Sequence, residues 1–281
     1  MATSPAIGNH SEEDRAGSVH RRVLRVRDGT TSMDVDAVAS EVPLALSYNG
    51  ESFAVMMATP LDLEDFALGF SLSEAIIPCA SELSGIDVHP RLEGFAIDMR
   101  IPQARAEKLA LRARGMTGNS GCGLCGTREL EQVLRHPAPV AHGEALRAAA
   151  LQRGLAALGA AQPLNQATGA THAAAWADMD GKLVLLREDV GRHNALDKLI
   201  GAMALTRVEV ADGFLILTSR ASYEMVQKAA TFGIGLIAAI SAPTALAIHF
   251  AEACEVTLIG FARGTSHVIY THAQRVISGE S

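Results

Sequence analysis

The sequence has few cysteines, no excess of basic residues and no apolar stretch near its start. Only 4 of its 281 residues are cysteine, too few for a disulfide scaffold. Lys and Arg total 24 against 31 Asp and Glu, a formal net charge of −7, which argues against an extended nucleic-acid surface. Residues 1–20 are polar, lack a signal-peptide core and are expected to form a flexible tail. These absences favour a reducing, cytoplasmic compartment.

One long uncharged run resembles a membrane span. Residues 229–251 contain no Asp, Glu, Lys or Arg, and the run is long enough to cross a bilayer. However, Ser241-Ala242-Pro243 interrupts it, because the residue before a proline avoids the helical region. The pattern therefore predicts a buried strand at 236–240 and a helix with Pro243 in its first turn, with no membrane span.

The first half predicts a smaller α+β domain over residues 21–117. Alternating apolar residues on either side of Asn49-Gly50 predict a hairpin over 42–57, and a second hairpin is expected over 86–101. Between them, Thr59-Pro60 is expected to be the N-cap and first residue of a helix. A further helix is expected over residues 103–114.

Residues 118–139 are expected to form a glycine-rich loop and a linker helix. The loop holds Cys122 and Cys125, and the glycines around them allow backbone conformations that suit a mobile loop presenting sulfur. A thiolate is the reactive form of cysteine, and the helix predicted after Cys125 would acidify it. The Cys-X-X-Cys motif serves sulfur carriers, zinc sites and dithiol redox proteins, so by itself it leaves three functions open.

The surrounding sequence argues against two of these functions, the zinc site and the dithiol redox protein. Structural zinc needs four ligands, and Cys79 and Cys254 have no ligand at short spacing, so both are expected to be buried apolar thiols. A zinc deaminase has His-X-Glu before Pro-Cys-X-X-Cys, whereas His172 is followed by Ala173-Ala174 and comes after the cysteines. A thioredoxin-like dithiol joins a strand to a helix, but this motif lies between two domains. No metal site is expected.

Residues 140–281 predict an α/β domain that opens with a helix at about 143–158. Its strands alternate with helices, which is typical of a largely parallel sheet. Asp180-Gly181 predicts an antiparallel partner for the first of these strands, so the sheet is expected to be mixed. The four expected strands are 183–187, 214–218, 236–240 and 256–260.

Ligands of open α/β sheets bind beyond the carboxyl ends of the strands. The residues that the pattern places there are Arg192, His193, Ser219, Arg220, Ser222, Ser241 and Arg263. Three of these turns also start helices, whose free N–H groups favour anions, so the pattern predicts a phosphate or pyrophosphate site. Alternatively, these residues only cap helices and pair with carboxylates such as Glu188 and Asp189. His172 is the remaining candidate acid/base group, unless it is a satisfied core histidine.

These residues resemble a known family, the FdhD formate dehydrogenase accessory sulfurtransferases. The resemblance extends from about Val42 to Ile277. The motifs that carry it include Cys122-Gly123-Leu124-Cys125-Gly126, Thr168-Gly169-Ala170-Thr171-His172, Arg187-Glu188-Asp189-Val190-Gly191-Arg192-His193-Asn194-Ala195, Ser219-Arg220-Ala221-Ser222-Tyr223-Glu224, Ser241-Ala242-Pro243-Thr244 and Gly260-Phe261-Ala262-Arg263.

The resemblance implies a sulfurtransferase that takes sulfur from a cysteine desulfurase and passes it to the molybdenum bis(molybdopterin guanine dinucleotide) cofactor of formate dehydrogenase. It implies Cys122 as the persulfide residue and Cys125 as its partner thiol, without giving the order of transfer. The implied cofactor-binding segment is Phe261, Ala262, Arg263, Gly264, Thr265 and Ser266.

The same resemblance implies a homodimer, and for the C-terminal part a cytidine-deaminase-like mixed sheet with helices on both faces and no zinc. A cofactor-binding chaperone without sulfur transfer and a zinc-stabilised domain are the alternatives.

Overall fold

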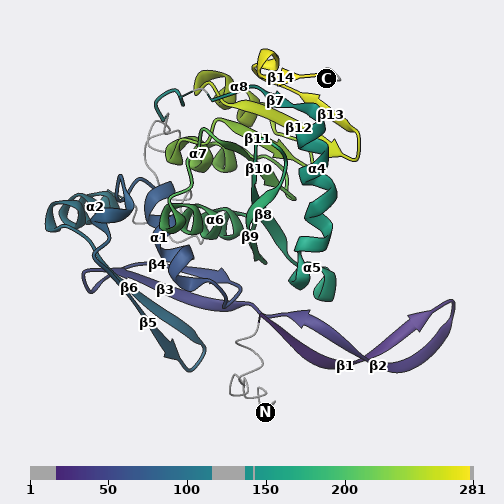
Figure 1. Cartoon of the computed structure of the whole chain (residues 1–281). Helices are drawn as coiled ribbons and strands as arrows, with labels where there is room; N and C mark the ends of the chain where they lie inside the picture. Colours follow the sequence, from purple (N-terminus) through teal and green to yellow (C-terminus); the bar gives the residue numbers. More distant parts are fainter. Residues whose placement is uncertain (1–16, 116–136, 142, 279–281) are drawn as a thin grey trace, which may run out of the picture.

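The computed structural model describes residues 17–115, 137–141 and 143–278. Figure 1 shows a six-stranded sheet between helices, a four-stranded sheet beside it, and a two-stranded hairpin that projects from the body. The protein is therefore mixed α/β, as predicted. Cys122 and Cys125, the loop around them and the expected linker helix lie outside the described residues.

The six-stranded sheet has the order β13-β12-β11-β10-β8-β9. Strands β10, β11 and β12 are parallel, whereas β8 is antiparallel to both its neighbours and β13 is antiparallel to β12. The mixed sheet and the hairpin across Asp180-Gly181 are thus confirmed. The strands are β8 (His172–Asp178), β9 (Leu183–Asp189), β10 (Gly213–Leu217), β11 (Leu236–Ala239), β12 (Thr257–Arg263) and β13 (Ser266–Ile269).

Helices cover both faces of this sheet (Figure 1). Along β10, Leu215 and Leu217 face one side while Phe214 and Ile216 face the other, because side chains alternate along a strand. The first side packs on α6 (Arg192–Thr206), α7 (Tyr223–Phe232) and α8 (Ala245–Ala253), and the second on α4 (Ala148–Leu158). The smaller elements of this part are β7 (Leu146–Arg147), η3 (Gly159–Ala161), α5 (Pro163–Thr168), η4 (Ala273–Arg275) and β14 (Val276–Ile277).

The four-stranded sheet has the order β4-β3-β6-β5 and contains both hairpins expected in the first half. Asn49 and Gly50 have φ values of 51° and 81°, the left-handed pair that a tight two-residue hairpin turn needs. The helix expected at 103–114 is also confirmed. The elements are β3 (Val42–Tyr48), β4 (Glu51–Ala58), η2 (Ala80–Glu82), β5 (Gly85–Arg91), β6 (Gly94–Arg100) and α2 (Gln103–Gly115).

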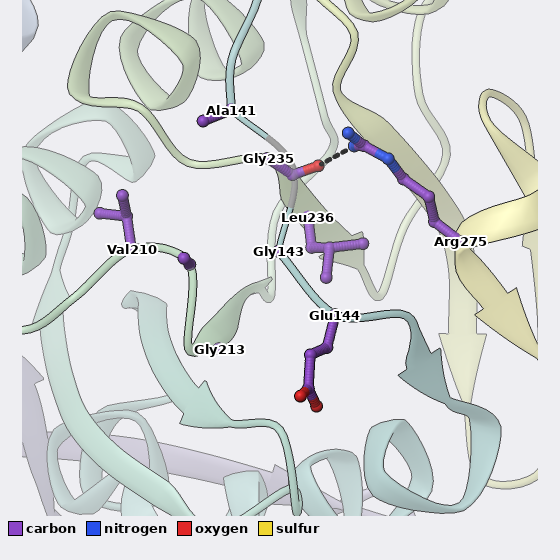
Figure 2. Close-up of a pocket in the computed structure, with 9 residues that line it drawn as sticks. Ala141, Gly143, Glu144, Val210, Gly213, Gly235, Leu236 and Arg275 are labelled. Carbon is purple, nitrogen blue, oxygen red and sulfur yellow. Dashed lines mark hydrogen bonds between the residues drawn. The ribbon is translucent and has the colours of Figure 1, made fainter.

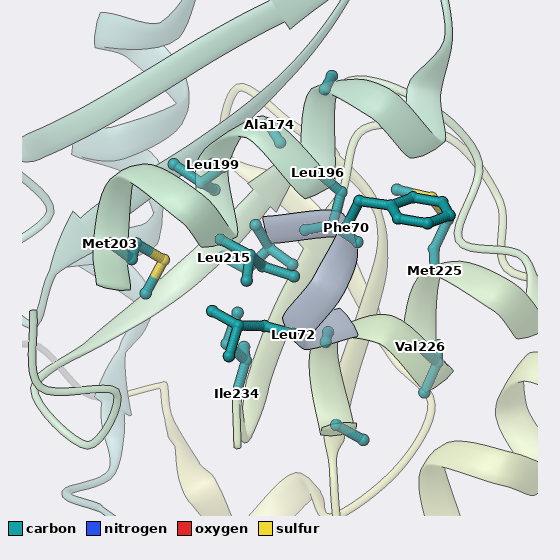
Figure 3. Close-up of a cluster of buried hydrophobic side chains, with 14 of the residues drawn as sticks. Phe70, Leu72, Ala174, Leu196, Leu199, Met203, Leu215, Met225, Val226 and Ile234 are labelled. Carbon is teal, nitrogen blue, oxygen red and sulfur yellow. The ribbon is translucent and has the colours of Figure 1, made fainter. Parts of the chain in front are cut away.

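Helix α1 (Leu63–Ser73) joins the two sheets. Figure 3 shows its Phe70 and Leu72 among Leu196 and Leu199 of α6 and Leu215 of β10. One hydrophobic cluster therefore extends from β3 and β6 to the large sheet, across the expected domain boundary.

Two glycines set the distance between α1 and α6. A Cβ added to Gly69 would lie 1.7 Å from the carbonyl oxygen of Asp197, and one added to Gly201 would lie 1.9 Å from that of Asp65. The two backbones are in direct contact at this crossing, which only glycine permits.

The expected cap at Thr59-Pro60 was wrong, since α1 begins at Leu63. Thr59 instead contacts the other half of the molecule. Its N–H donates to Asp189 Oδ2 (3.0 Å), its hydroxyl accepts from Val190 N (3.1 Å), and its carbonyl accepts from Lys198 Nζ (2.9 Å). Tertiary partners outside the local sequence thus fix the conformation at Thr59.

The hairpin of β1 (Ser18–Arg27) and β2 (Thr30–Ala39) was not predicted. The expected tail at 1–20 is therefore wrong for residues 18–20, which belong to β1. Asp28-Gly29 forms the turn, with φ values of 50° and 80°. An Asp-Gly pair between β-branched residues is a strong hairpin signal that could have revealed it.

Three boundaries in the second half also differ from expectation. Helix α4 begins at Ala148, because the residues just before it pair with β14 as β7. Pro243 precedes α8, and Thr244 is the N-cap, its hydroxyl accepting from Ala247 N (3.2 Å). Strand β12 continues to Arg263, because it pairs with β13. In the described part of the chain, no helix has the length and apolar character needed to cross a membrane.

Candidate functional site

The loops after β10, β11 and β12 are joined by backbone hydrogen bonds at the carboxyl edge of the sheet. Ile240 N donates to Leu217 O (2.8 Å), Thr244 N to Ala221 O (3.1 Å) and Phe261 N to Ser241 O (3.2 Å). The structure therefore brings together the residues predicted on these loops. They are Ser219, Arg220, Ser222, Ser241 and Arg263, and the last of these lies at the end of β12 beside Phe261 and Ala262, which the resemblance implies.

His172 lies at the same edge because β8 runs antiparallel to its neighbours. Its backbone is opposite Asp189, the last residue of β9. The next residue, Ala173, donates its N–H to Thr218 Oγ1 (2.8 Å), which continues the pairing of β8 with β10 beyond the strand end. His172 is thus close to Arg192 and His193 at the start of α6, as its electrostatic interactions with both show.

His172 is half-buried, and its environment favours the neutral imidazole. Burial lowers its pKa, and the positive charge of Arg192 lowers it further, while Asp189 acts in the opposite direction. A neutral imidazole can accept a proton, and the acid/base role of His172 stays a prediction.

His193 pairs with a carboxylate that the sequence analysis did not assign. Its Nε2 lies 2.7 Å from Oε2 of Glu224, in the first turn of α7. The hydrogen bond from His193 lowers the pKa of Glu224, and the charge of Arg192 adds to this effect. Glu224 occurs within the motif Ser219–Glu224, so the signal was present in the sequence.

At this edge the side-chain atoms Arg192 Nε and Ser222 Oγ are buried and have no hydrogen-bond partner among the described residues. Ser222 is the N-cap of α7, yet its side chain makes no capping hydrogen bond. A buried polar group without a partner is costly, so these atoms suit hydrogen bonds to a bound anion.

Glu188 and Asp189, the carboxylates that the alternative interpretation pairs with the basic residues of the carboxyl edge, have other partners. Glu188 accepts hydrogen bonds from Leu164 N (2.9 Å) and Asn165 N (2.7 Å) at the start of α5. Asp189 lies 2.7 Å from Nζ of Lys198, and both side chains are fully buried. Within the described part of the chain, neither carboxylate pairs with an arginine of the edge, so that alternative is wrong for both.

The segment expected to contact the cofactor is part of a hairpin. Phe261 to Arg263 belong to β12, Gly264 and Thr265 form the turn, and Ser266 begins β13. Phe261 has a φ of 50° at an irregularity in the β12–β13 register, and the residue is 46 % exposed. A non-glycine residue in this conformation is strained, and such strain often marks a functional position. The exposed Arg263 donates its Nε to Ile240 O (3.1 Å).

A small hollow lies at the opposite, amino edge of the sheet (Figure 2). Gly213 and Leu236, at the starts of β10 and β11, line it together with Arg275, which donates to Gly235 O (3.4 Å). Burial lowers the pKa of Arg275. This hollow contains none of the predicted site residues.

The two cysteines within the described residues differ from each other. Cys254 is buried, as expected, and burial raises the pKa of its thiol. Cys79 was expected to be buried but is exposed, because it lies at the start of the short η2 turn, where its Sγ is 3.2 Å from Ser81 Oγ. Over residues 17–115, 137–141 and 143–278, no three His, Cys, Asp or Glu side chains cluster as metal ligands.

The fold and this edge define a class: a mixed α/β protein whose strand ends gather arginines, histidines and hydroxyls suited to an anionic ligand. Comparison with known proteins narrows the class. The chain belongs to the FdhD/NarQ family, whose family model matches residues 39–277. The resemblance noted in the sequence is therefore confirmed.

Relatives match over nearly the whole chain. The sulfur carrier protein FdhD of Xanthomonas euvesicatoria is 55% identical over 278 residues, covering 99% of this chain and 97% of the relative. The protein of the same name from Cupriavidus necator is 52% identical and covers 90% and 88%. A crystal structure described as a formate dehydrogenase accessory protein from Desulfotalea psychrophila superposes with a TM-score of 0.75 at 25% identity, covering 92% of this chain and 99% of that one. The cytidine-deaminase-like detail of the fold stays a prediction.

Proposed function

We propose that this protein is a sulfur carrier that acts in the maturation of formate dehydrogenase. The observation that carries the proposal is the similarity over 99% of the chain to a protein named sulfur carrier protein FdhD. The Cys-X-X-Cys sequence of residues 122–125 supplies the thiols that such a carrier needs.

In the detailed form of this proposal, the protein is a sulfurtransferase. A cysteine desulfurase loads sulfur onto Cys122 as a persulfide, and the sulfur then passes to the molybdenum bis(molybdopterin guanine dinucleotide) cofactor. Release of the outer persulfide sulfur as sulfide requires two electrons. Attack by the Cys125 thiolate on the inner sulfur of the persulfide would supply them, forming a Cys122–Cys125 disulfide.

The carboxyl edge of the large sheet is the proposed site for the cofactor, which is a substrate here. Two guanine dinucleotides bring pyrophosphates, which match the arginines and helix N-termini at this edge. Arg192 Nε and Ser222 Oγ are buried atoms that could bond to phosphate oxygens. Phe261 offers an exposed ring on which a flat base could stack.

Persulfide labelling tests the carrier function. The protein is incubated with a cysteine desulfurase and cysteine, and its intact mass is measured. We expect a gain of about 32 Da, one sulfur atom, on Cys122. The gain should disappear in Cys122→Ala and persist in Cys79→Ala, which removes an exposed thiol outside the loop. A wild-type protein without the gain would contradict the proposal.

The same variant separates the carrier from a cofactor-binding chaperone without sulfur transfer. A chaperone of this kind would still restore formate dehydrogenase activity in cells with Cys122→Ala, whereas a sulfur carrier would not. A zinc-stabilised domain would instead contain stoichiometric zinc after purification. A cytoplasmic location and a homodimeric state remain predictions.

A further inference from the structure

Helices α6 and α7 lie side by side on one face of the large sheet, and both begin at its carboxyl edge (Figure 1). The second residue of α6 is His193, and the second residue of α7 is Glu224. One helical turn further on, α6 carries Asp197 and α7 carries Lys228, on the same faces of the two helices. Two acid–base pairs therefore connect the helices, an outer pair at the edge and an inner pair one turn below it.

The inner pair is buried and has several partners. Lys228 Nζ lies 3.0 Å from both carboxylate oxygens of Asp197 and 3.0 Å from Glu74 Oε1. Asp197 also accepts a hydrogen bond from the hydroxyl of Ser73 (2.6 Å), at the end of α1. Burial disfavours a charged Lys228, but the charges of Asp197 and Glu74 outweigh it and raise the pKa of Lys228. The inner pair thus fixes how α6 and α7 lie against each other, and with that the outer pair.

The outer pair is partly exposed, since the side chains of His193 and Glu224 are 29 and 27 % accessible. Nε2 of His193 is itself buried, 2.7 Å from Glu224 Oε2, in a contact that is short but bent. Polar contacts of this kind commonly straighten when a functional site binds its substrate. The accessible part of the ring lies away from Nε2, so Nδ1 is the ring nitrogen that is left for a ligand.

An ionised carboxylate is unexpected at an anion site, because it repels phosphate. The contact with His193 lowers the pKa of Glu224 despite its partial burial, and the charges of Arg192 and Lys228 lower it further. Glu224 is therefore an anion at neutral pH, flanked by His193 and Lys228. If Glu224 only stood near the ligand, removing its charge would tighten anion binding. If Glu224 orients His193, removing its charge would weaken anion binding.

We propose that Glu224 is a positioning residue of the anion site. It holds His193 with the Nε2–H directed at α7, so that a protonated Nδ1 donates to a phosphate oxygen of the guanine dinucleotide. The carboxylate also stabilises the imidazolium that makes this bond. The assignment rests on the cofactor site proposed above, and it adds to that site a carboxylate that acts only through His193.

Calorimetric titration of the full chain with GDP tests the sign of the effect. Glu224→Gln keeps the size of the side chain and removes its charge, and it should weaken GDP binding about 10-fold, the value of a charge-assisted hydrogen bond. Glu252→Gln is the matched control, because Glu252 lies 3.8 Å from His272 Nε2, in a pair that contains no predicted site residue. The control should bind GDP as the wild type does. Unchanged or tighter binding by Glu224→Gln, or equal weakening in both variants, would overturn the proposal.

A double-mutant cycle tests whether Glu224 acts through His193. His193→Ala alone should weaken GDP binding by about 10-fold or more. In that background Glu224→Gln should cause no further loss, because the carboxylate has no ring left to orient. A further loss of the same size as in the wild-type background would refute action through His193.

Nitrogen NMR of the histidine rings gives a result that does not need the nucleotide. The His193 resonances, assigned by their loss in His193→Gln, should show a protonated Nε2 in the wild type. They should change in Glu224→Gln but not in Glu252→Gln. Unchanged His193 resonances in Glu224→Gln would refute the proposal even where GDP binds. A wild type that binds no GDP but shows this tautomer would refute the proposed cofactor site and support the orientation of His193 by Glu224.

Discussion

Asp189 and Lys198 form an ion pair that is completely buried where β9 and α6 meet. Asp189 Oδ1 also accepts from Gly191 N (2.8 Å) and Asn194 Nδ2 (3.0 Å), so this one side chain orients the start of α6. Arg192 and His193 occupy that start. The position of two predicted site residues therefore depends on a carboxylate that has no expected contact with the ligand.

Removing the charge of Asp189 should destabilise the protein strongly. Asp189→Asn would leave Lys198 as an uncompensated buried cation, which lowers the free energy of unfolding by about 3–5 kcal/mol. Urea denaturation measures this value. Asp34→Asn breaks an exposed pair with Arg25 and should change the free energy of unfolding little. Similar losses in both variants would show that the burial of the pair is unimportant.

Arg263 and Arg153 allow a matched test of the nucleotide site. Both are exposed and donate Nε to a carbonyl oxygen, Ile240 O for Arg263 and Asp180 O for Arg153, but only Arg263 lies at the carboxyl edge. Arg263→Ala should weaken GDP binding by about 10–100-fold, the value of a charged hydrogen bond. Calorimetric titration should show no such change for Arg153→Ala. Equal effects would argue against a nucleotide contact at Arg263.

His172 should make stability depend on pH. Its folded-state pKa is lowered, first by burial, so below its ordinary value of 6.5 the unfolded chain binds a proton that the folded chain does not. The free energy of unfolding should therefore decrease as the pH falls below about 6.5, until the folded-state pKa is passed. His172→Gln should reduce this slope in urea titrations between pH 7 and 5, and an unchanged slope would refute the assignment.

At the scale of elements, local signals predicted most strands and helices. Asn49-Gly50 and Asp180-Gly181 predicted their hairpins correctly, because tight turns need residues that tolerate left-handed conformations. The β1–β2 hairpin was missed although Asp28-Gly29 marks its turn, whereas two boundaries that differ from expectation depend on distant partners. The start of α1 is set by contacts of Thr59 with the other half of the chain, and β12 extends to Arg263 because β13 pairs with it.

In the candidate site too, features set by local sequence could be predicted, and features set by contacts between separate elements could not. Arg192 and Ser222 could be placed from the sequence, because loops after parallel strands converge at one edge. The pairing of His193 with Glu224 and the left-handed backbone of Phe261 could not, since each depends on how separate elements meet.

The crossing of α1 and α6 should tolerate no side chain at its glycines. Gly69→Ala would press a methyl group against the backbone of Asp197 and should lower the free energy of unfolding by about 3 kcal/mol or more. Gly159→Ala is the control, because its backbone is helical and nothing lies within 4 Å of the added Cβ. That variant should be neutral or slightly stabilised. Thermal unfolding compares them, and equal stability would refute the close crossing.

At the scale of the whole molecule, the shared hydrophobic cluster predicts that both halves unfold together. The only tryptophan, Trp176, is buried in β8 and reports on the C-terminal half, while far-UV circular dichroism reports on the whole chain. The two signals should give one urea transition with the same midpoint. Phe66→Ala, in α1, should shift both by the equivalent of about 3–5 kcal/mol. Separate midpoints would mean that the halves unfold independently.

The contacts of Thr59 with the C-terminal half of the chain are difficult to remove by mutating Thr59 itself. Two of its three hydrogen bonds to the other half use the peptide N–H and carbonyl, which every residue except proline retains. A substitution at position 59 other than proline removes only the hydroxyl acceptor, so the two backbone hydrogen bonds can be broken only from their partner side chains, Asp189 and Lys198.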